Sequence, residues 1–262
     1  MNKIKITIIT VSFNSQKTIA RTIESVVGQS YDNIEYCIVD GNSSDGTVDI
    51  IKRYYALFPD IIKYVSEPDE GIYDAMNKGI RMSSGEIVGI VNSDDWLEKD
   101  AIQFVYDSVA TNDFSMDCIY TGGIMFHGKH KDIAMMPNLL EMKKKSRMYY
   151  MGGIKHPATF VPRRIYNSFG LYNAEMKISA DTDFILRCYF GGVAIIPMNR
   201  ILSNMAEGGI STTLSFKTLK LGYSDYKRRL VEFNVPVIRK KYLQLCDLVM
   251  RFCKILKGFL VK

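Results

Sequence analysis

The sequence lacks a long uninterrupted run of apolar residues. None of its 262 residues lies in a stretch that reaches the roughly 18 consecutive apolar residues of a membrane-spanning helix. The opening run, 4–11, has the pattern of a strand with no cleavage site after it, so we expect no signal peptide. Hydrophobic residues make up 47% of the chain and charged residues 24%, which is typical of a globular protein with a real core.

Cysteine is scarce and shows no pairing pattern. The five cysteines are an odd number, and no two of them form a Cys-x-x-Cys pair. We therefore expect buried free thiols and a reducing, cytoplasmic compartment. Internal repeats and low-complexity linkers are also missing.

The first hundred residues alternate between two hydrophobic patterns. Such alternation predicts βαβ units and a mainly parallel sheet with helices on both faces. Strands are expected at 4–11, 34–39, 61–65 and 87–91, and helices at 15–27, 45–58, 73–82 and 100–110.

The pattern loosens after about residue 114. Further strands are expected at 118–126, 133–136, 157–162 and 193–196, with a helix at 181–190 and a loop or short helix at 141–147. From residue 214 the chain has a helical pattern in two segments, split near Pro236. The prediction is a catalytic domain over 1–213 and a helical extension over 214–262.

Two carboxylates follow the most apolar strand. The run 87–91 leads directly into Asn92, Ser93, Asp94 and Asp95. A buried unpaired carboxylate is costly, so these acids must emerge at the carboxyl end of the strand, where open α/β sheets bind ligands. Two hard oxygen donors there suit a divalent cation that bridges a diphosphate.

Two other segments have polar residues at a helix start. Asp40 ends a strand and precedes a turn rich in Gly, Asn and Ser, which favours binding of a base or ribose, whereas Asp45 is best explained as a helix cap. Asp69 lies among acids before the helix near Ile72. These acids fit either a solvated helix start or a wall of the substrate site.

These three motifs, in this order and spacing, resemble the family 2 glycosyltransferases. The resemblance covers roughly residues 4–212. It implies an α/β GT-A nucleotide-diphospho-sugar transferase fold and an inverting reaction. Within the family, the helix Gly71 to Gly79 is most similar to bacterial enzymes that build surface polysaccharides.

The resemblance also implies a donor site. Its nucleotide and sugar contacts would be Thr10, Val11, Ser12, Asp40, Asp69, Asn92 and Ser93. Asp94, with Asp95 behind it, falls at the position that holds Mn²⁺ or Mg²⁺. The family's metal motif is Asp-x-Asp, and this chain departs from it because Asn92 occupies the first position.

A fourth motif, Ser179 to Arg187, matches the family's general-base segment. The family has a pair of acids here. Ala180 replaces the first, which leaves Asp181 as the general base that takes the acceptor's proton. The alternative for Asp181 is a helix cap. Asp183 is expected to pair with Arg187, four residues later on the same helix.

Weaker signals concern the acceptor side. His156 either lines the acceptor or diphosphate site or is structural. Gly208 and Ser211 belong to a loop that either closes over the substrate or is a simple turn. Asp183 and Arg187 are also assigned to the acceptor side.

Charge is unevenly distributed. Residues 217–262 hold 12 Lys and Arg against 3 Asp and Glu, a net of +9, which leaves −3 for the rest of a chain whose net charge is +6. Apolar residues between 245 and 259 repeat every three or four positions with basic residues between them. This pattern favours a helix lying on an anionic membrane, with packing on the domain or on a second copy in a homodimer as the alternatives.

The interpretation is a metal-dependent inverting glycosyltransferase on the inner face of the cytoplasmic membrane. It would move a sugar from a UDP-sugar to a lipid-linked glycan. One alternative is a sugar-nucleotidyltransferase, but the loop Ser12 to Gln16 lacks the Gly-rich, basic signature. Another is a non-catalytic membrane scaffold, supported by Asn92 and Ala180. Nucleic-acid binding is not expected, because the body has no basic face interleaved with aromatic residues.

Overall fold

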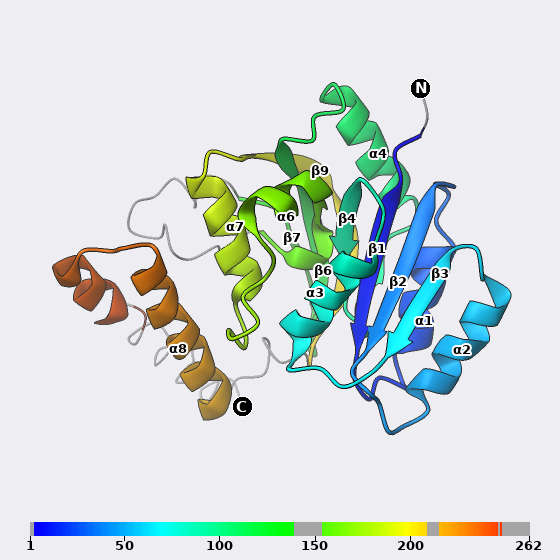
Figure 1. The fold of residues 1–262 in the computed structure, drawn as a ribbon, viewed down its shortest axis with the longest axis horizontal. Helices are drawn as coiled ribbons and strands as arrows, with labels where there is room; N and C mark the ends of the chain where they lie inside the picture. Colours follow the sequence, from blue (N-terminus) through cyan, green and yellow to red (C-terminus); the bar gives the residue numbers. More distant parts are fainter. Residues whose placement is uncertain (1–2, 139–153, 209–214, 246, 248–262) are drawn as a thin grey trace.

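The computed structural model describes residues 3–138, 154–208, 215–245 and 247 (Figure 1). The strands are β1 (Ile6–Ser12), β2 (Ile34–Asp40), β3 (Ile62–Ser66), β4 (Ile87–Ile90), β5 (Trp96–Leu97), β6 (Cys118–His127), β7 (Asp132–Met135), β8 (Thr159–Pro162) and β9 (Ala194–Ala206). The helices are α1 (Ile19–Val27), α2 (Thr47–Leu57), α3 (Ile72–Met82), α4 (Ala101–Thr111), the 3₁₀ turn η1 (His156–Ala158), α6 (Arg163–Phe169), α7 (Ala180–Phe190) and α8 (Phe216–Glu232). A further helical segment spans 237–245.

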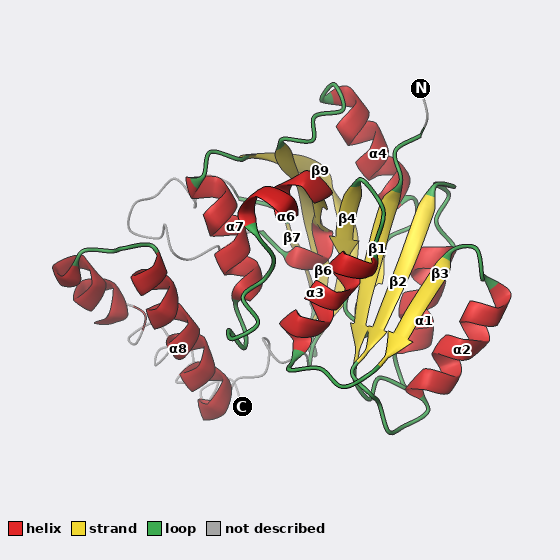
Figure 2. Ribbon diagram, viewed as in Figure 1, coloured by secondary structure: helices red, strands yellow, loops and turns green. Residues whose placement is uncertain are grey.

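One mixed sheet forms the centre of the molecule (Figure 2). Its order is β3-β2-β1-β4-β8-β6-β9-β5, with β7 paired to β6. The strands β1 to β4 are parallel, whereas β8 runs antiparallel to both β4 and β6. The expected α/β fold is therefore confirmed, and β1 to β4 form its parallel part. The sheet as a whole is mixed, because β5 and β7 also pair antiparallel, with β9 and β6 respectively.

Each face of the sheet carries its own hydrophobic core. Successive side chains of a strand point to opposite faces, so Ile8 belongs to one cluster and Ile9 to the other. The first cluster takes residues from α1, α2 and α4, and the second from α3, α6 and α7. The apolar strands of the first hundred residues are buried on both sides, as their runs of β-branched residues predict.

Most of the expected elements are present, and three differ. Strand β9 extends for 13 residues, far beyond the expected 193–196, because it pairs with β6 across two register shifts. The short elements β5 and α6 were not predicted. The expected loop or helix at 141–147 lies outside the described residues. No helix in the described part of the chain has the length and apolar character required to cross a membrane.

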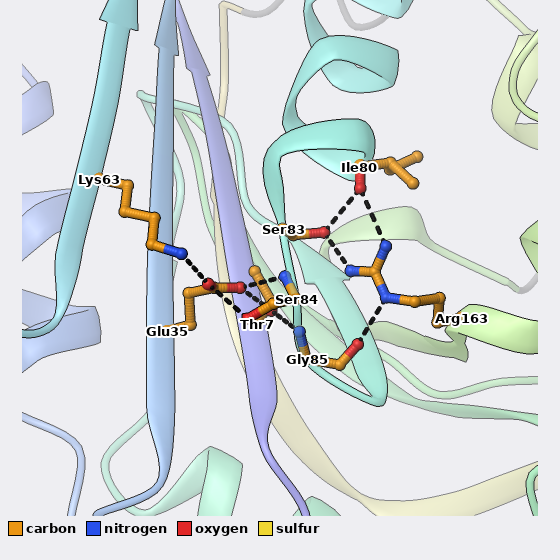
Figure 3. Close-up of polar contacts among 8 residues, drawn as sticks. All are labelled: Thr7, Glu35, Lys63, Ile80, Ser83, Ser84, Gly85 and Arg163. Atoms are coloured by element: carbon orange, nitrogen blue, oxygen red, sulfur yellow. Dashed lines mark hydrogen bonds and ion pairs between the residues drawn. The ribbon is translucent and has the colours of Figure 1, made fainter.

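At the amino end of the parallel strands, a buried carboxylate ties neighbouring segments together (Figure 3). Glu35, 5% exposed, accepts hydrogen bonds from the Thr7 hydroxyl, the Lys63 ammonium and the backbone N–H and hydroxyl of Ser84. Burial alone would raise the pKa of Glu35. These bonds outweigh it and lower the pKa from 4.5 to about 2.

Beside this carboxylate, Arg163 holds the turn between α3 and β4. Its guanidinium donates to the carbonyl oxygens of Gly85 and Ile80 at 2.8 and 3.1 Å, and to the Ser83 hydroxyl. Both networks lie at the amino ends of the parallel strands, whereas Asp40 and Asn92 lie at the carboxyl ends. The amino ends of these strands are therefore tied together, at the end of the sheet opposite these candidate site residues.

The first prediction concerns Glu35→Gln. A carboxyl with a depressed folded-state pKa stabilises the fold above its unfolded pKa, and this contribution is lost as pH falls from about 4.5 toward 2. We expect the substitution to lower the free energy of unfolding at pH 7 by about 2 kcal/mol. The variant should also lose less stability than the wild type between pH 5 and pH 3, as measured by urea unfolding.

Asp32→Asn is the matched control. Asp32 pairs with Lys3 at 2.7 Å, but both side chains are more than half exposed, and such pairs contribute little. Equal effects of the two substitutions would contradict the role given to Glu35.

Candidate active site

The predicted site residues gather at the carboxyl edge of the parallel strands. Ser12 and Asp40 end β1 and β2 as register partners, and Ser66 ends β3. The segment 92–95 follows β4, which lies beside β1. Because these strands are parallel, their carboxyl ends lie side by side at the same end of the sheet.

Asp40 is fully buried at this edge. Its carboxylate accepts hydrogen bonds from the hydroxyls of Ser12 at 3.0 Å and Ser66 at 2.8 Å, and from the backbone N–H of Ser43 at 2.9 Å. The Ser43 hydroxyl adds another at 2.5 Å. Asp40 thus locks the turn after β2 to the ends of β1 and β3. Its contact with a base stays a prediction.

The other predicted nucleotide contacts divide into two groups. The side chains of Thr10 and Val11 are buried, and the Thr10 hydroxyl accepts a hydrogen bond from Tyr36 at 2.9 Å. The Thr10 and Val11 side chains therefore lie in the core, and not on the rim of the candidate site. Asp69 lies on the rim, against Gly41, where a side chain on residue 41 would collide with its carboxylate.

The backbone of the segment 92–95 is held tightly from α1. The Thr22 hydroxyl donates to the carbonyl oxygens of Ser93 and Asp95 at 3.0 and 2.7 Å. Arg21 donates to the Asp94 carbonyl at 2.8 Å and stacks on the Trp96 ring, 3.6 Å from its centroid. Sequence reasoning missed these supports, because one helix face gives no hint of which distant carbonyls it meets.

The two aspartates have different environments. Asp95 is 1% exposed and accepts the backbone N–H of Ala206 at 3.2 Å. Burial, reinforced by the nearby charge of Asp94, raises the pKa of Asp95 to about 7. Asp94 is only half-buried. Asp94 is therefore the more accessible carboxylate of the two, and its role in metal binding stays a prediction.

His156 joins Asn92, at the carboxyl end of β4, to Asp181, the candidate base. Its Nε2 lies 3.1 Å from Nδ2 of Asn92, and its Nδ1 lies 3.7 Å from Oδ2 of Asp181. The sequence places these three residues 64 and 25 positions apart. The fold brings them into one row, because η1 directly precedes β8, the neighbour of β4.

Asp181 has the properties of a proton acceptor. The Tyr73 hydroxyl donates to its Oδ1 at 3.3 Å, and its side chain keeps 26% of its surface exposed. Burial acts to raise its pKa. The hydrogen bond and charge of His156 outweigh burial, so the pKa of Asp181 is lowered and the carboxylate is ionised at neutral pH.

A small cavity adjoins this carboxylate. Its volume of about 20 Å³ is large enough for one water molecule or hydroxyl group. Apolar side chains, including Ile90, Val161 and Ile185, form much of its wall, and His156 and Asp181 supply polar groups. The combination places a basic oxygen beside a site of hydroxyl size.

The remaining predicted residues lie apart from this row. Asp183 is buried and pairs with Arg187 at 2.9 Å, as expected, and Arg187 also donates to the Leu171 carbonyl at 2.7 Å. This pair joins α7 to the preceding loop and does not line the cavity. Gly208 has a φ of +118°, which favours glycine. Ser211 lies outside the described residues.

Comparison with known proteins shows which family and which relatives the sequence resembles. The model of Glycosyl transferase family 2 matches residues 7–170. The chain is 36% identical over 110 residues to chondroitin synthase from Escherichia coli, which covers 42% of the chain and 16% of that protein. It is 27% identical over 211 residues to a PGL/p-HBAD biosynthesis glycosyltransferase from Mycobacterium bovis, covering 79% of each.

Solved structures share the fold. The chain superimposes on S. aureus TarS 1–349 in complex with UDP-GlcNAc with a TM-score of 0.67 and 16% identity, covering 93% of this chain and 71% of that one. For the mannosyltransferase PcManGT from Pyrobaculum calidifontis, in complex with GDP-Man and Mn²⁺, the TM-score is 0.66 at 14% identity, covering 100% and 77%. The expected GT-A fold is confirmed.

The second prediction concerns His156→Ala. Because His156 lowers the pKa of Asp181, its removal should raise that pKa toward the value that burial alone dictates. The measurement is a ¹³C NMR titration of the Asp181 carboxyl carbon. His130→Ala, an exposed histidine between β6 and β7, should leave the titration unchanged. An unmoved Asp181 pKa in the His156 variant would refute the link.

Proposed function

The chain belongs to glycosyltransferase family 2, and we propose that it is an inverting enzyme that moves a sugar from a UDP-sugar to a lipid-linked glycan in bacterial surface-polysaccharide synthesis. The observation that carries the mechanism is the row Asn92–His156–Asp181. It sets a basic carboxylate beside the strand ends expected to hold the donor. The chondroitin synthase and PGL/p-HBAD relatives support the polymer or glycolipid product class.

The donor's diphosphate would lie against the segment 92–95. Asn92 Oδ1 is buried and has no hydrogen-bond partner among the described residues. A buried acceptor left unpaired costs free energy, so it favours a ligand that donates to it, such as a ribose hydroxyl, or that coordinates it. The TarS complex, with UDP-GlcNAc, supports a UDP-sugar as donor, whereas GDP-Man in PcManGT marks the guanine alternative.

A divalent cation fits Asp94 with limited protein ligation. The described residues contain no group of three or more His, Cys, Asp or Glu suited to a metal. Mg²⁺ and Mn²⁺ sites of this kind combine one or two carboxylates with the substrate's phosphates. Asp94, half-buried and two residues after Asn92 in the chain, would supply such a carboxylate. When bound, the cation supplies positive charge that neutralises the leaving diphosphate.

The chain's own residues would carry the proton transfer. Asp181, ionised at neutral pH, accepts the proton of the acceptor hydroxyl while that oxygen attacks the anomeric carbon from the face opposite the diphosphate. Tyr73 and His156 hold the two carboxylate oxygens from different sides. A single base with no second carboxylate acting as nucleophile fits inversion.

The C-terminal segment supports a membrane-bound acceptor. On the helix 237–245, Ile238, Tyr242 and Leu245 are 87%, 63% and 61% exposed and lie on one face, with Lys241 beside them. Apolar and basic side chains together suit the headgroup region of an anionic membrane. The stretch 248–262, which carries most of the predicted amphipathic pattern, lies outside the described residues.

The third prediction tests the donor site with Asp94→Ala. Calorimetric titration of UDP, with Mn²⁺ and with EDTA, should show metal-dependent binding in the wild type and at least tenfold weaker binding in the variant with Mn²⁺. Asp107→Ala, which removes an exposed carboxylate on α4, is the matched control. Binding of another nucleotide but not UDP would mean that the donor sugar is carried by that other nucleotide. No nucleotide binding at all would favour the scaffold alternative.

The fourth prediction tests the base with Asp181→Asn. The amide keeps the shape but has no basic oxygen, so kcat should fall by about 10²- to 10⁴-fold. UDP affinity should stay within twofold, because Asp181 is placed on the acceptor side. Transfer is followed as UDP release from the UDP-sugar selected by a donor screen. Wild-type kcat in this variant would exclude Asp181 as the base.

A further inference from the structure

Helix α8 contacts the segment that leads into the candidate base. In Figure 1 it lies beside α7, although it follows that helix by more than 25 residues and falls outside the family match over 7–170. Two of its charged side chains are buried: Asp225 is 5% exposed and Arg229 3%. Buried charges need partners, so their contacts show what this helix holds.

Asp225 binds three consecutive backbone N–H groups. Its Oδ2 accepts from Lys177 at 3.1 Å, Ile178 at 2.8 Å and Ser179 at 3.1 Å. A carboxylate surrounded by successive amides makes strong charge-assisted bonds and fixes the conformation of the backbone that donates them. These amides end one residue before α7, and Asp181 is the second residue of that helix.

Arg229 holds the same point from the other side. Its Nη2 donates to the Ser179 carbonyl at 3.1 Å and to the Ser179 hydroxyl at 2.6 Å. Ser179 is the N-cap of α7, yet its side chain makes no capping bond within that helix. The hydroxyl that normally caps a helix is bound by α8 instead, so the start of α7 depends on α8.

Outer contacts extend the attachment. Arg228 pairs with Glu175, and Asn173 donates to Glu232 at 3.2 Å. The apolar residues of α8 pack mainly with the helix that follows it, in a cluster of its own. The attachment of α8 to the 173–179 segment is therefore largely polar and directional.

We propose that α8 is a positioning clamp, in which Asp225 and Arg229 fix residues 177–179 so that Asp181 faces His156 and the acceptor. The inference rests on the proposed role of Asp181 as the base. Misplacement of a reacting group by about 1 Å costs around 10²-fold in rate, so a clamp one turn away controls turnover without touching substrate.

Charge supports this geometry. The groups facing Asp181 are His156 from η1, Tyr73 from α3 and Arg229 from α8. Burial acts to raise the pKa of Asp181, whereas His156, the backbone N–H of Thr182 and, to a smaller extent, the Arg229 charge lower it. Arg229 in turn faces the carboxylates of Asp183, Asp181 and Asp225.

The fifth prediction separates position from charge. In Asp225→Asn, amide hydrogen exchange at 177–179 should quicken by at least tenfold, because the anionic acceptor is lost. In Arg229→Met, the ¹³C titration of the Asp181 carboxyl should move to higher pH, and Arg229→Lys should restore it. Asp107→Asn on α4 should change neither. UDP affinity with Mn²⁺ should stay within twofold in every variant, which verifies that each one is folded.

A kinetic cycle tests whether the clamp acts through the base. Asp225→Asn should lower kcat at least tenfold with an unchanged KM for the donor. Added to Asp181→Asn, it should change the residual kcat by less than twofold, because no base remains to be positioned. An equal loss in both backgrounds would overturn the proposal.

The two hypotheses fail in different ways. An active Asp181→Asn enzyme would contradict the proposed function, whatever α8 does. Unchanged exchange at 177–179 together with an unmoved Asp181 titration would contradict the clamp, even if Asp181→Asn is inactive.

Discussion

The pairing of β4 with β8 is the contact on which the site depends. Gly89 lies opposite Phe160, and a side chain at residue 89 would collide with the Phe160 ring, so this register needs glycine. Because β8 runs antiparallel to β4, its first residues lie where β4 ends. The register therefore places His156 against Asn92 and, through His156, connects the carboxyl end of β4 with α7. A shift of one residue would turn the facing side chains to the other side of the sheet.

The sequence predicted the first half of the fold well, because that half obeys local rules. Its strands β1, β2 and β4 are buried runs, and helices that follow the strands cover the two faces of the sheet. The second half does not have this simplicity. Strand β9 alternates irregularly between exposed and buried residues and pairs with β6 across a bulge, so only its apolar start at 193–196 was recognisable. Helix α6 has seven residues and follows Pro162, too short for a periodic signal.

The site was predicted in its parts but not in its connections. Motif order indicated Asp40, Asp94, Asp181 and His156, and the fold brings the last two together. The net charge was misleading at one point, because Arg229 was counted in the basic segment 217–262 and is in fact 3% exposed, packed against the segment before α7. A charge count cannot distinguish a solvated cation from one that compensates buried carboxylates. That distinction requires the partners, which are some 50 residues away in the chain.

The distribution of buried charge argues against a scaffold with an abandoned site. Asp40 and Asp225 are buried and multiply hydrogen-bonded, which costs desolvation that an apolar core would avoid. Such groups serve to orient what they bind: a turn at the donor edge in one case and the start of α7 in the other. Asn92 Oδ1, by contrast, is buried with no hydrogen-bond partner among the described residues, and Asp94, two residues later, is only half-buried. Fixing the surroundings of an unsatisfied group costs stability that a bound ligand would recover, so this arrangement favours the proposed enzyme over the scaffold alternative.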